Sequence, residues 1–214
     1  MTTLDSFRQA AIAWAVRGDD EAQAVAIRLS PDILSVVLVE GVSDAAAVET
    51  LADRTGQNRE RVCIIPMGGL TNIAHFLRTL GPAGLGIGLA GLCDVNEEPY
   101  LRRALIAAGF GPLESAADLP PVGFFVCVVD LEEELIRALG AARVQEVLDE
   151  QGDLRAFRVF QNQPAQRERS LERQLRRFLG TTAGRKEKYG AALVAGLDLD
   201  RVPAPLRDLV QFVF

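Results

Sequence analysis

The sequence is poor in cysteine, and the few it has are widely spaced. Cys63, Cys93 and Cys127 each lie inside an apolar run of the 214-residue chain. This spacing matches neither a zinc motif nor a disulfide framework. We expect buried free thiols in a reducing compartment, because cysteine packs as a small apolar side chain. A secreted fold that depends on disulfide bonds is therefore disfavoured.

Long apolar runs and an export signal are also missing from the sequence. The most apolar stretches, residues 36–39 and 124–129, are far too short to span a bilayer. The first residues lack a cationic segment followed by an apolar run and a small-residue cleavage site. We therefore expect a cytoplasmic protein that does not bind membranes.

Histidine and lysine are scarce, and this narrows the possible chemistry. The one histidine, His75, falls in an expected helix between apolar residues, so a Ser-His-Asp or Cys-His arrangement has no obvious base. The phosphate-binding pattern Gly-x-x-x-x-Gly-Lys-Ser/Thr does not occur, which argues against an internal nucleotide motor. The only two lysines, Lys186 and Lys188, lie almost side by side in a chain rich in arginine. Lysine presents a compact point charge, whereas arginine presents a planar fork, so the two lysines are candidates for a functional site.

Charge is distributed unevenly along the chain. The net charge is −6, yet residues 155–188 carry ten basic and three acidic side chains, whereas residues 1–154 carry eleven basic and twenty-three acidic ones. A basic segment on an acidic body is one footprint of a polyanion-binding protein and is compatible with a nucleic-acid partner. The alternatives are a solvated helix face and a face that docks on the acidic body. The arginines expected to contact nucleic acid are Arg167, Arg169, Arg173, Arg176, Arg177 and Arg185.

Short apolar, β-branched runs alternate with helical periodicity in the middle of the chain, which is typical of α/β proteins. The expected strands are residues 35–39, 62–66, 85–93 and 123–129. The helices expected between and after them are residues 43–54, with Ser43 as N-cap, 71–80, 97–108 and 131–139. This order predicts a parallel four-stranded sheet flanked by helices on both faces.

Helical periodicity also precedes and follows the expected sheet. We expect N-terminal helices within residues 1–32, an α/β domain at residues 33–140 and an all-helical C-terminal region at residues 141–214. The helices expected in the two outer parts are residues 3–17, 20–29, 143–150, 168–178, 185–197 and 204–212.

Acidic residues follow three of the four expected strands. Glu40 follows the first, Asp94 the third and Asp130 the fourth. Ligands collect at the carboxyl ends of parallel strands, and clustered carboxylates repel one another unless a cation holds them. Oxygen ligands suit Mg²⁺ or Mn²⁺, so these loops predict a metal site. The alternative is that each acid independently caps a helix.

The segment Val39-Glu40-Gly41-Val42-Ser43-Asp44 resembles the E-G-x-x-D opening of Toprim domains, which occur in topoisomerases, primases, recombination-mediator proteins and OLD-family nucleases. Residues 64–69, 72–73, 89–94 and 184–186 resemble OLD-type and related stand-alone bacterial Toprim proteins in particular. The Toprim resemblance covers residues 33–135, and the resemblance to the stand-alone proteins extends over most of the chain. It implies a Toprim-like sheet and phosphodiester chemistry.

The resemblance implies roles for three acids. Glu40 matches the Toprim glutamate, which is a metal ligand or a general acid/base. Asp44 matches the acid one turn later that OLD-type sites use in coordination, and Asp94 matches the first Asp of the D-x-D pair on the third strand.

The sequence departs from the family at the second position of that pair, which is Asn96. Asparagine still offers a carbonyl oxygen as a metal ligand, but it lowers the charge of the site. Glu97 or Glu98 is expected to substitute, which leaves open whether one or two metal ions bind. Asp130 and Glu132 match the acid-bearing loop after the fourth strand more loosely.

A lysine completes the implied site. Lys188, or else Lys186, resembles the C-terminal lysine that OLD nucleases place near the scissile phosphate. The resemblance thus implies Mg²⁺-dependent phosphodiester hydrolysis, in which the lysine neutralises charge that develops in the transition state. One alternative is a non-catalytic Toprim module that binds DNA or a separately encoded ATPase. Another is an unrelated phosphotransfer domain with Asp94 as nucleophile and Lys188 as its support. An oligomer is compatible with each.

Overall fold

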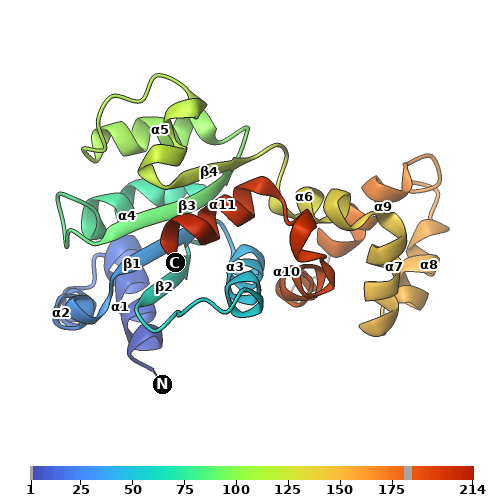
Figure 1. Ribbon diagram of the computed structural model, residues 1–214, viewed down its shortest axis with the longest axis horizontal. Helices are drawn as coiled ribbons and strands as arrows, with labels where there is room; N and C mark the ends of the chain where they lie inside the picture. Colours follow the sequence, from blue (N-terminus) through green and yellow to red (C-terminus); the bar gives the residue numbers. More distant parts are fainter. Residues whose placement is uncertain (1, 181–184) are drawn as a thin grey trace.

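The protein is built around a parallel four-stranded sheet, as the sequence predicts (Figure 1). This computed structural model describes residues 2–180 and 185–214, apart from the side chains of Arg185 and Lys186. The strands are β1 (Ser35–Val39), β2 (Val62–Pro66), β3 (Gly88–Asp94) and β4 (Phe124–Cys127). Their order in the sheet is β2-β1-β3-β4, so β1 and β3 lie in its centre.

Helices cover both faces of the sheet, because successive residues of each strand point to opposite sides. Val37 and Leu92 belong to one core, and Val36 and Leu89 belong to the other. On the first side, α3 (Val42–Arg54) and α11 (Ala204–Val213) contact the strands, and α6 (Leu131–Leu139) and α10 (Arg185–Gly196) extend the same core beyond them. The helices on the second side are α1 (Thr3–Arg17), α2 (Asp20–Leu29), α4 (Ile73–Leu80) and α5 (Glu98–Ala107). Burial on both faces explains why the strands are continuously apolar in the sequence.

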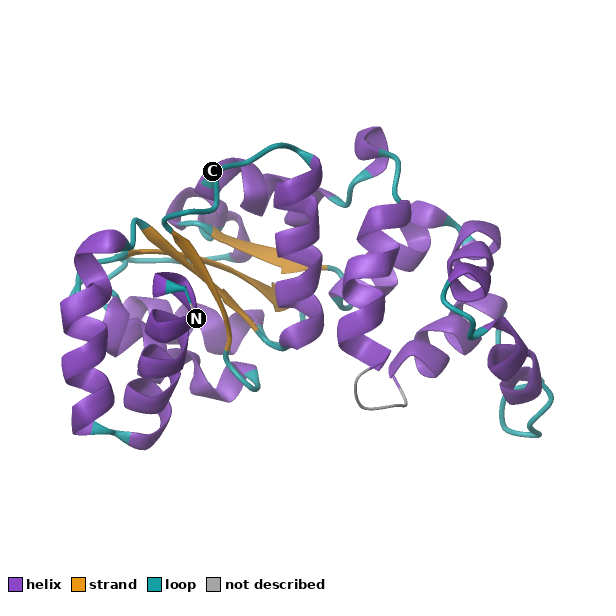
Figure 2. Cartoon of the chain, turned by 90° about the horizontal axis from the view of Figure 1, so that it is seen from below, coloured by secondary structure: helices purple, strands orange, loops and turns teal. Residues whose placement is uncertain are grey.

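Three further helices form a lobe beyond α6 (Figures 1 and 2). They are α7 (Ala141–Glu150), α8 (Leu154–Gln161) and α9 (Leu171–Gly180). Helix α8 was not predicted from the sequence; its one fully buried residue, Phe157, packs against Phe178 of α9 with ring centroids 5.2 Å apart. Short 3₁₀ turns cover Ser30–Asp32, Leu70–Asn72, Ala116–Asp118, Pro120–Val122 and Leu199–Arg201. None of the helices in the described residues combines the length and apolarity needed to cross a membrane.

The last described helix returns to the sheet. Helix α11 packs against β3 and β4, and its Phe212 meets Phe125 of β4 edge to face, with ring centroids 6.1 Å apart. The C-terminal region is helical in its described part, as predicted, but α11 joins the layer on the first side of the sheet and α10 packs against α3. The boundary at residue 140 stays a prediction.

Hydrogen bonds explain where the expected element bounds are wrong. The third strand begins at Gly88 because Leu85 and Ile87 donate to the carbonyls of Thr79 and Leu80 at the end of α4. The fourth strand ends at Cys127 because the Val128 N–H donates to the Glu134 carboxylate, at 3.0 Å. Ser43 is not the N-cap of α3, since the helix starts one residue earlier and Gly41 takes that position.

Helices α3 and α10 cross at a glycine. A Cβ atom on Gly190 would lie 2.2 Å from the carbonyl oxygen of Ser43, so only glycine fits at this crossing. We expect Gly190→Ala to lower the free energy of unfolding by about 2–3 kcal/mol, because two backbones must separate. Urea unfolding would measure this. Gly196→Ala is the comparison: its Cβ would meet a movable side-chain atom of Val147 at 3.0 Å, so a smaller loss is expected. Equal losses in both variants would contradict the crossing argument.

Candidate metal centre

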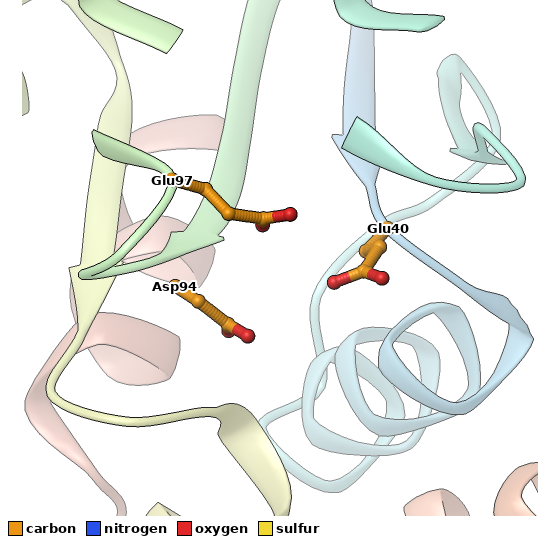
Figure 3. Close-up of side chains that lie close together, drawn as sticks. All are labelled: Glu40, Asp94 and Glu97. Atoms are coloured by element: carbon orange, nitrogen blue, oxygen red, sulfur yellow. The ribbon is translucent and has the colours of Figure 1, made fainter. Parts of the chain in front are cut away.

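Three carboxylates converge at the carboxyl edge of the sheet. Glu40, Asp94 and Glu97 each offer an oxygen, and these three oxygens lie within 4.8 Å of one another. Figure 3 shows the three side chains pointing into a common space. We call this set the acidic triad. All of its ligand atoms are oxygens, which is the donor chemistry that Mg²⁺ and Mn²⁺ prefer.

The local backbone explains why these residues meet. Parallel pairing of β1 with β3 brings the ends of both strands to one edge, where Glu40 follows β1 and Asp94 ends β3. A turn then reverses the chain, closed by a 2.9 Å hydrogen bond from the Glu97 N–H to the Asp94 carbonyl. The turn places the third carboxylate beside the second, immediately before α5 begins.

The charges of the acidic triad are unfavourable without a cation. Partial burial raises the pKa of Asp94 to about 7, with further contributions from the nearby carboxylates of Glu40 and Asp130. Burial, followed by the Glu40 charge, also raises the pKa of Glu97. Within the described part of the chain, the buried Oε2 atom of Glu97 has no hydrogen-bond partner. A divalent cation would satisfy this oxygen and offset the repulsion, so the residues present fit such an ion.

Asp44 lies both at the first turn of α3 and in the cavity at the edge of the sheet. Its Oδ2 atom accepts a hydrogen bond from the Gly41 N–H at 2.9 Å, which caps the first turn of α3. The residue also lines a cavity of about 390 Å³ together with Glu40 and Asp94. Asp44 therefore lies at the edge of the acidic triad, although it is outside the group whose oxygens approach within 4.8 Å.

Asp130 is held between a helix and an arginine. Its Oδ1 atom accepts a hydrogen bond from the Glu133 N–H at 2.7 Å, which caps α6. Its Oδ2 atom accepts hydrogen bonds from Nε of Arg176, at 2.8 Å, and from Nη2 of the same residue. Asp130 and Glu132 line the same cavity as Glu40 and Asp94, so both lie near the acidic triad without joining it.

The structure distinguishes among the candidate substitutes for the second Asp of the D-x-D pair. Asn96 is exposed. Glu98 forms an ion pair with Arg102, whose Nε atom lies 2.8 Å from the carboxylate. Glu97 is thus the residue that the fold brings to Asp94 and Glu40.

Four of the six predicted nucleic-acid-binding arginines gather in a second cavity, of about 590 Å³. We call it the arginine pocket; its lining residues are Arg169, Arg173, Arg176, Arg177, Gly180, Asp130 and Glu132. It shares the last two with the cavity of the acidic triad. Arg167 is exposed outside this lining and donates its Nε hydrogen to the Asn162 carbonyl, at 3.1 Å. The Arg185 side chain lies outside the described residues.

Lys188 contacts the helical lobe. Its Nζ atom donates to the Gln151 carbonyl at 2.9 Å and lies 3.3 Å from Oδ2 of Asp153, between α7 and α8. The same carboxylate oxygen accepts a hydrogen bond from the hydroxyl of buried Tyr189, at 2.9 Å. The side chain of Lys186 lies outside the described residues.

The turn after β2 lines the site, although the sequence did not predict this. Gly68 and Gly69 line the cavity of the acidic triad, and their φ angles of 72° and 116° favour glycine. The sequence signal that could have indicated this turn was the Gly-Gly pair that follows an apolar strand.

Comparison with known proteins connects this geometry to a family. Residues 34–95 match the family described as Overcoming lysogenization defect protein-like, TOPRIM domain. The chain is therefore similar to OLD-like Toprim proteins. The match includes Glu40, Asp44 and Asp94, whereas Glu97 and the arginine pocket lie beyond it. The family match therefore carries no information about these later residues, and their position beside the site is known from the structure alone.

Solved structures extend the likeness beyond the Toprim domain. The C-terminal region of the Xanthomonas campestris pv. campestris OLD protein is similar with a TM-score of 0.62 and 26% sequence identity, over 85% of this chain and 94% of that one. The C-terminal region of the Burkholderia pseudomallei OLD protein shares the fold, with a TM-score of 0.59 and 21% identity, over 85% of this chain and 96% of that one. A search of curated protein sequences finds no match.

Proposed function

We propose that this protein hydrolyses phosphodiester bonds of nucleic acid, with DNA favoured, and that it needs a divalent cation. The observation that carries the proposal is that an acidic surface and a basic surface lie next to each other. Two members of the acidic triad, Glu40 and Asp94, line a cavity that shares Asp130 and Glu132 with an arginine-lined one. A phosphodiester that bridges the two would have its charge neutralised from both sides.

Glu40, Asp94 and Glu97 would hold Mg²⁺ or Mn²⁺, and Asp44 lines the same cavity. The bound ion would polarise the phosphodiester and lower the pKa of a coordinated water. The protein residues would fix the position of the ion, and the arginines would orient the nucleic-acid backbone beside it. Because these backbone contacts are electrostatic, affinity should fall with salt and depend little on base sequence.

Two side chains, Lys188 and Arg176, are candidates for the positive charge that would neutralise the transition state. Lys188 retains this role in the proposal, but its ammonium group would have to leave Asp153 and Gln151 first. Arg176 already lies beside the acidic cavity through its ion pair with Asp130. Arg176 is therefore the better placed of the two described cations.

The direct test is a cleavage assay on linear, supercoiled and single-stranded DNA with Mg²⁺, with Mn²⁺ or with a chelator. We expect cleavage in either metal and none in the chelator. An RNA substrate of the same sequence would show whether DNA is preferred. Absence of cleavage for every substrate and metal would contradict the proposal.

The exposed Asn96 favours a second candidate function, a non-catalytic Toprim module that binds DNA or a separately encoded ATPase. An amide at this position lowers the negative charge available to a second metal ion. Calorimetric titration with Mg²⁺ in the presence of DNA separates the two candidates. DNA binding without metal binding would favour the module, and metal binding would favour the hydrolase.

Glu97 is expected to act as a ligand in place of the missing aspartate. Glu97→Gln should weaken Mn²⁺ binding by about tenfold, because a charged oxygen ligand is lost while the size of the side chain is kept. Calorimetric titration with Mn²⁺ measures the change. Glu98→Gln is the matched control, since Glu98 pairs with Arg102 and lies outside the acidic triad. Equal affinities for the two variants would contradict the assignment of Glu97.

A further inference from the structure

We infer that the arginine pocket binds the terminal phosphate monoester of a nucleic-acid strand and so places a strand end beside the acidic triad. The inference rests on the proposed function in taking nucleic acid as the ligand. It concerns binding rather than cleavage, so it can be tested without turnover.

The charge of the pocket matches a doubly charged group. Four arginines face two carboxylates in its lining, which leaves a formal excess of two positive charges. A phosphate monoester carries a charge of about −1.5 to −2 near pH 7. An internal phosphodiester carries a single negative charge, so a terminal phosphate neutralises the pocket more completely.

In the part of the chain that the structure describes, three of these four arginines form no ion pair. Arg176 pairs with Asp130. Among the described residues, Arg173 and Arg177 form no ion pair, and Arg169 donates its Nε hydrogen to the Ala165 carbonyl at 3.0 Å. Guanidinium groups that converge without partners repel one another, and an anion with several acceptor oxygens relieves this repulsion.

The backbone that carries these arginines is anchored. Arg173, Arg176 and Arg177 lie on one face of α9, because residues three and four apart are neighbours on a helix. The opposite face buries Leu175 and Phe178 in the core. Such anchoring lowers the entropy lost when the ligand binds.

The segment before α9 is fixed as well. The buried Gln174 amide donates from Nε2 to the Gln166 carbonyl at 2.8 Å and to the Arg169 carbonyl at 3.2 Å. Its Oε1 atom accepts a hydrogen bond from the Gln161 side chain of α8, at 2.7 Å. These bonds hold the backbone of Arg169 against the start of α9, and they explain why an arginine outside the helix joins the pocket.

The pocket lies next to the proposed metal site, so a strand end bound there would lie close to the proposed chemistry. Asp130 and Glu132 separate it from the cavity that contains Glu40 and Asp94. Its volume of about 590 Å³ is within the range of sites that hold a small organic ligand. The terminal phosphate and its nucleotide would fit there, and the following phosphodiester would extend toward the acidic triad. Strands with phosphorylated ends should therefore be preferred.

The experiment measures binding of short fluorescent single-stranded oligonucleotides by anisotropy in a chelator, where cleavage cannot proceed. Three ligands of one sequence carry a 5′-phosphate, a 3′-phosphate or hydroxyl groups at both ends, with the dye placed internally. We expect one phosphorylated ligand to bind about tenfold more tightly than the hydroxyl form. Whichever phosphate confers the gain identifies the strand end that is bound.

Substitutions test whether the tighter binding of the phosphorylated ligand depends on the arginine pocket. Arg173→Gln and Arg177→Gln should each bring the phosphorylated ligand close to the affinity of the hydroxyl form. Arg155→Gln is the control, because Arg155 is exposed on α8 and outside the pocket lining, and it should keep the gain. Equal affinity for all three ligands in the wild type, or a gain that survives both pocket substitutions, would overturn the inference.

The outcome is separate from that of the cleavage assay. A protein that prefers phosphorylated ends but does not cut supports the inference and contradicts the proposed hydrolysis. A protein that cuts without any preference for end chemistry contradicts the inference alone.

Discussion

Replacing Glu40 with glutamine is expected to lower metal-dependent DNA cleavage by about 10³-fold while the protein stays folded. Glutamine keeps the shape of the side chain but removes one charged oxygen from the acidic triad. Glu40 is exposed at the end of β1, so its replacement leaves the packing of the sheet unchanged. Initial cleavage rates in Mn²⁺, together with thermal unfolding of the same samples, measure both parts of the prediction.

Glu60→Gln is a matched control for this substitution. Glu60 is also an exposed glutamate, but it precedes β2 and so lies at the opposite edge of the parallel sheet. Its replacement should leave the cleavage rate within about twofold of the wild type, since surface substitutions away from a site have small effects. Full activity in both Glu40→Gln and Asp94→Asn would rule out the acidic triad as the catalytic centre.

Replacing Asp94 with asparagine is expected to stabilise the metal-free protein at pH 8. Burial and neighbouring carboxylates raise the pKa of Asp94 to about 7 in the folded state, above its ordinary value of 3.8. A folded state that holds the proton more tightly loses stability as the pH rises between these values. The wild type should thus weaken between about pH 4 and pH 7 and stay weaker above, whereas Asp94→Asn lacks this contribution.

Thermal unfolding across this pH range in a chelator measures the difference. Because Asp94 is only partly buried, solvent screens its interactions, and we expect a gain of a few degrees, on a scale of about 2–4 °C per kcal/mol. Adding Mg²⁺ or Mn²⁺ at pH 8 should raise the melting temperature of the wild type more than that of the variant. Parallel pH curves for the two proteins in the chelator would contradict a raised pKa at Asp94.

The sheet was predictable from the sequence because its strands are buried on both faces. Continuous apolar runs set the bounds of β1 and β2 correctly, and the parallel order explains why Glu40 and Asp94 reach the same edge. Helix α8 could not be predicted in this way. Its single fully buried side chain, Phe157, is a poor periodic signal, and its environment is created by Phe178 of a later helix.

Details of the site depend on contacts that local sequence does not encode. Helical spacing predicts a basic face on α9, but the pairing of Arg176 with Asp130 depends on how α9 packs against α6. The same limit applies to Lys188, since the family pattern implies a place near the phosphate and tertiary contacts bring its ammonium group to Asp153. Glu97 was one of two alternatives, and the turn after β3 brings its carboxylate, rather than that of Glu98, to Asp94 and Glu40.

The return of α11 to the sheet has a consequence for biosynthesis. Translation produces β3 and β4 well before residues 204–213, so the sheet face around Phe125 stays uncovered while the helical lobe is being made. Exposed apolar surface on a nascent chain favours aggregation and chaperone binding. A chain that ends before α11 would therefore have every residue of the acidic triad but an open hydrophobic face.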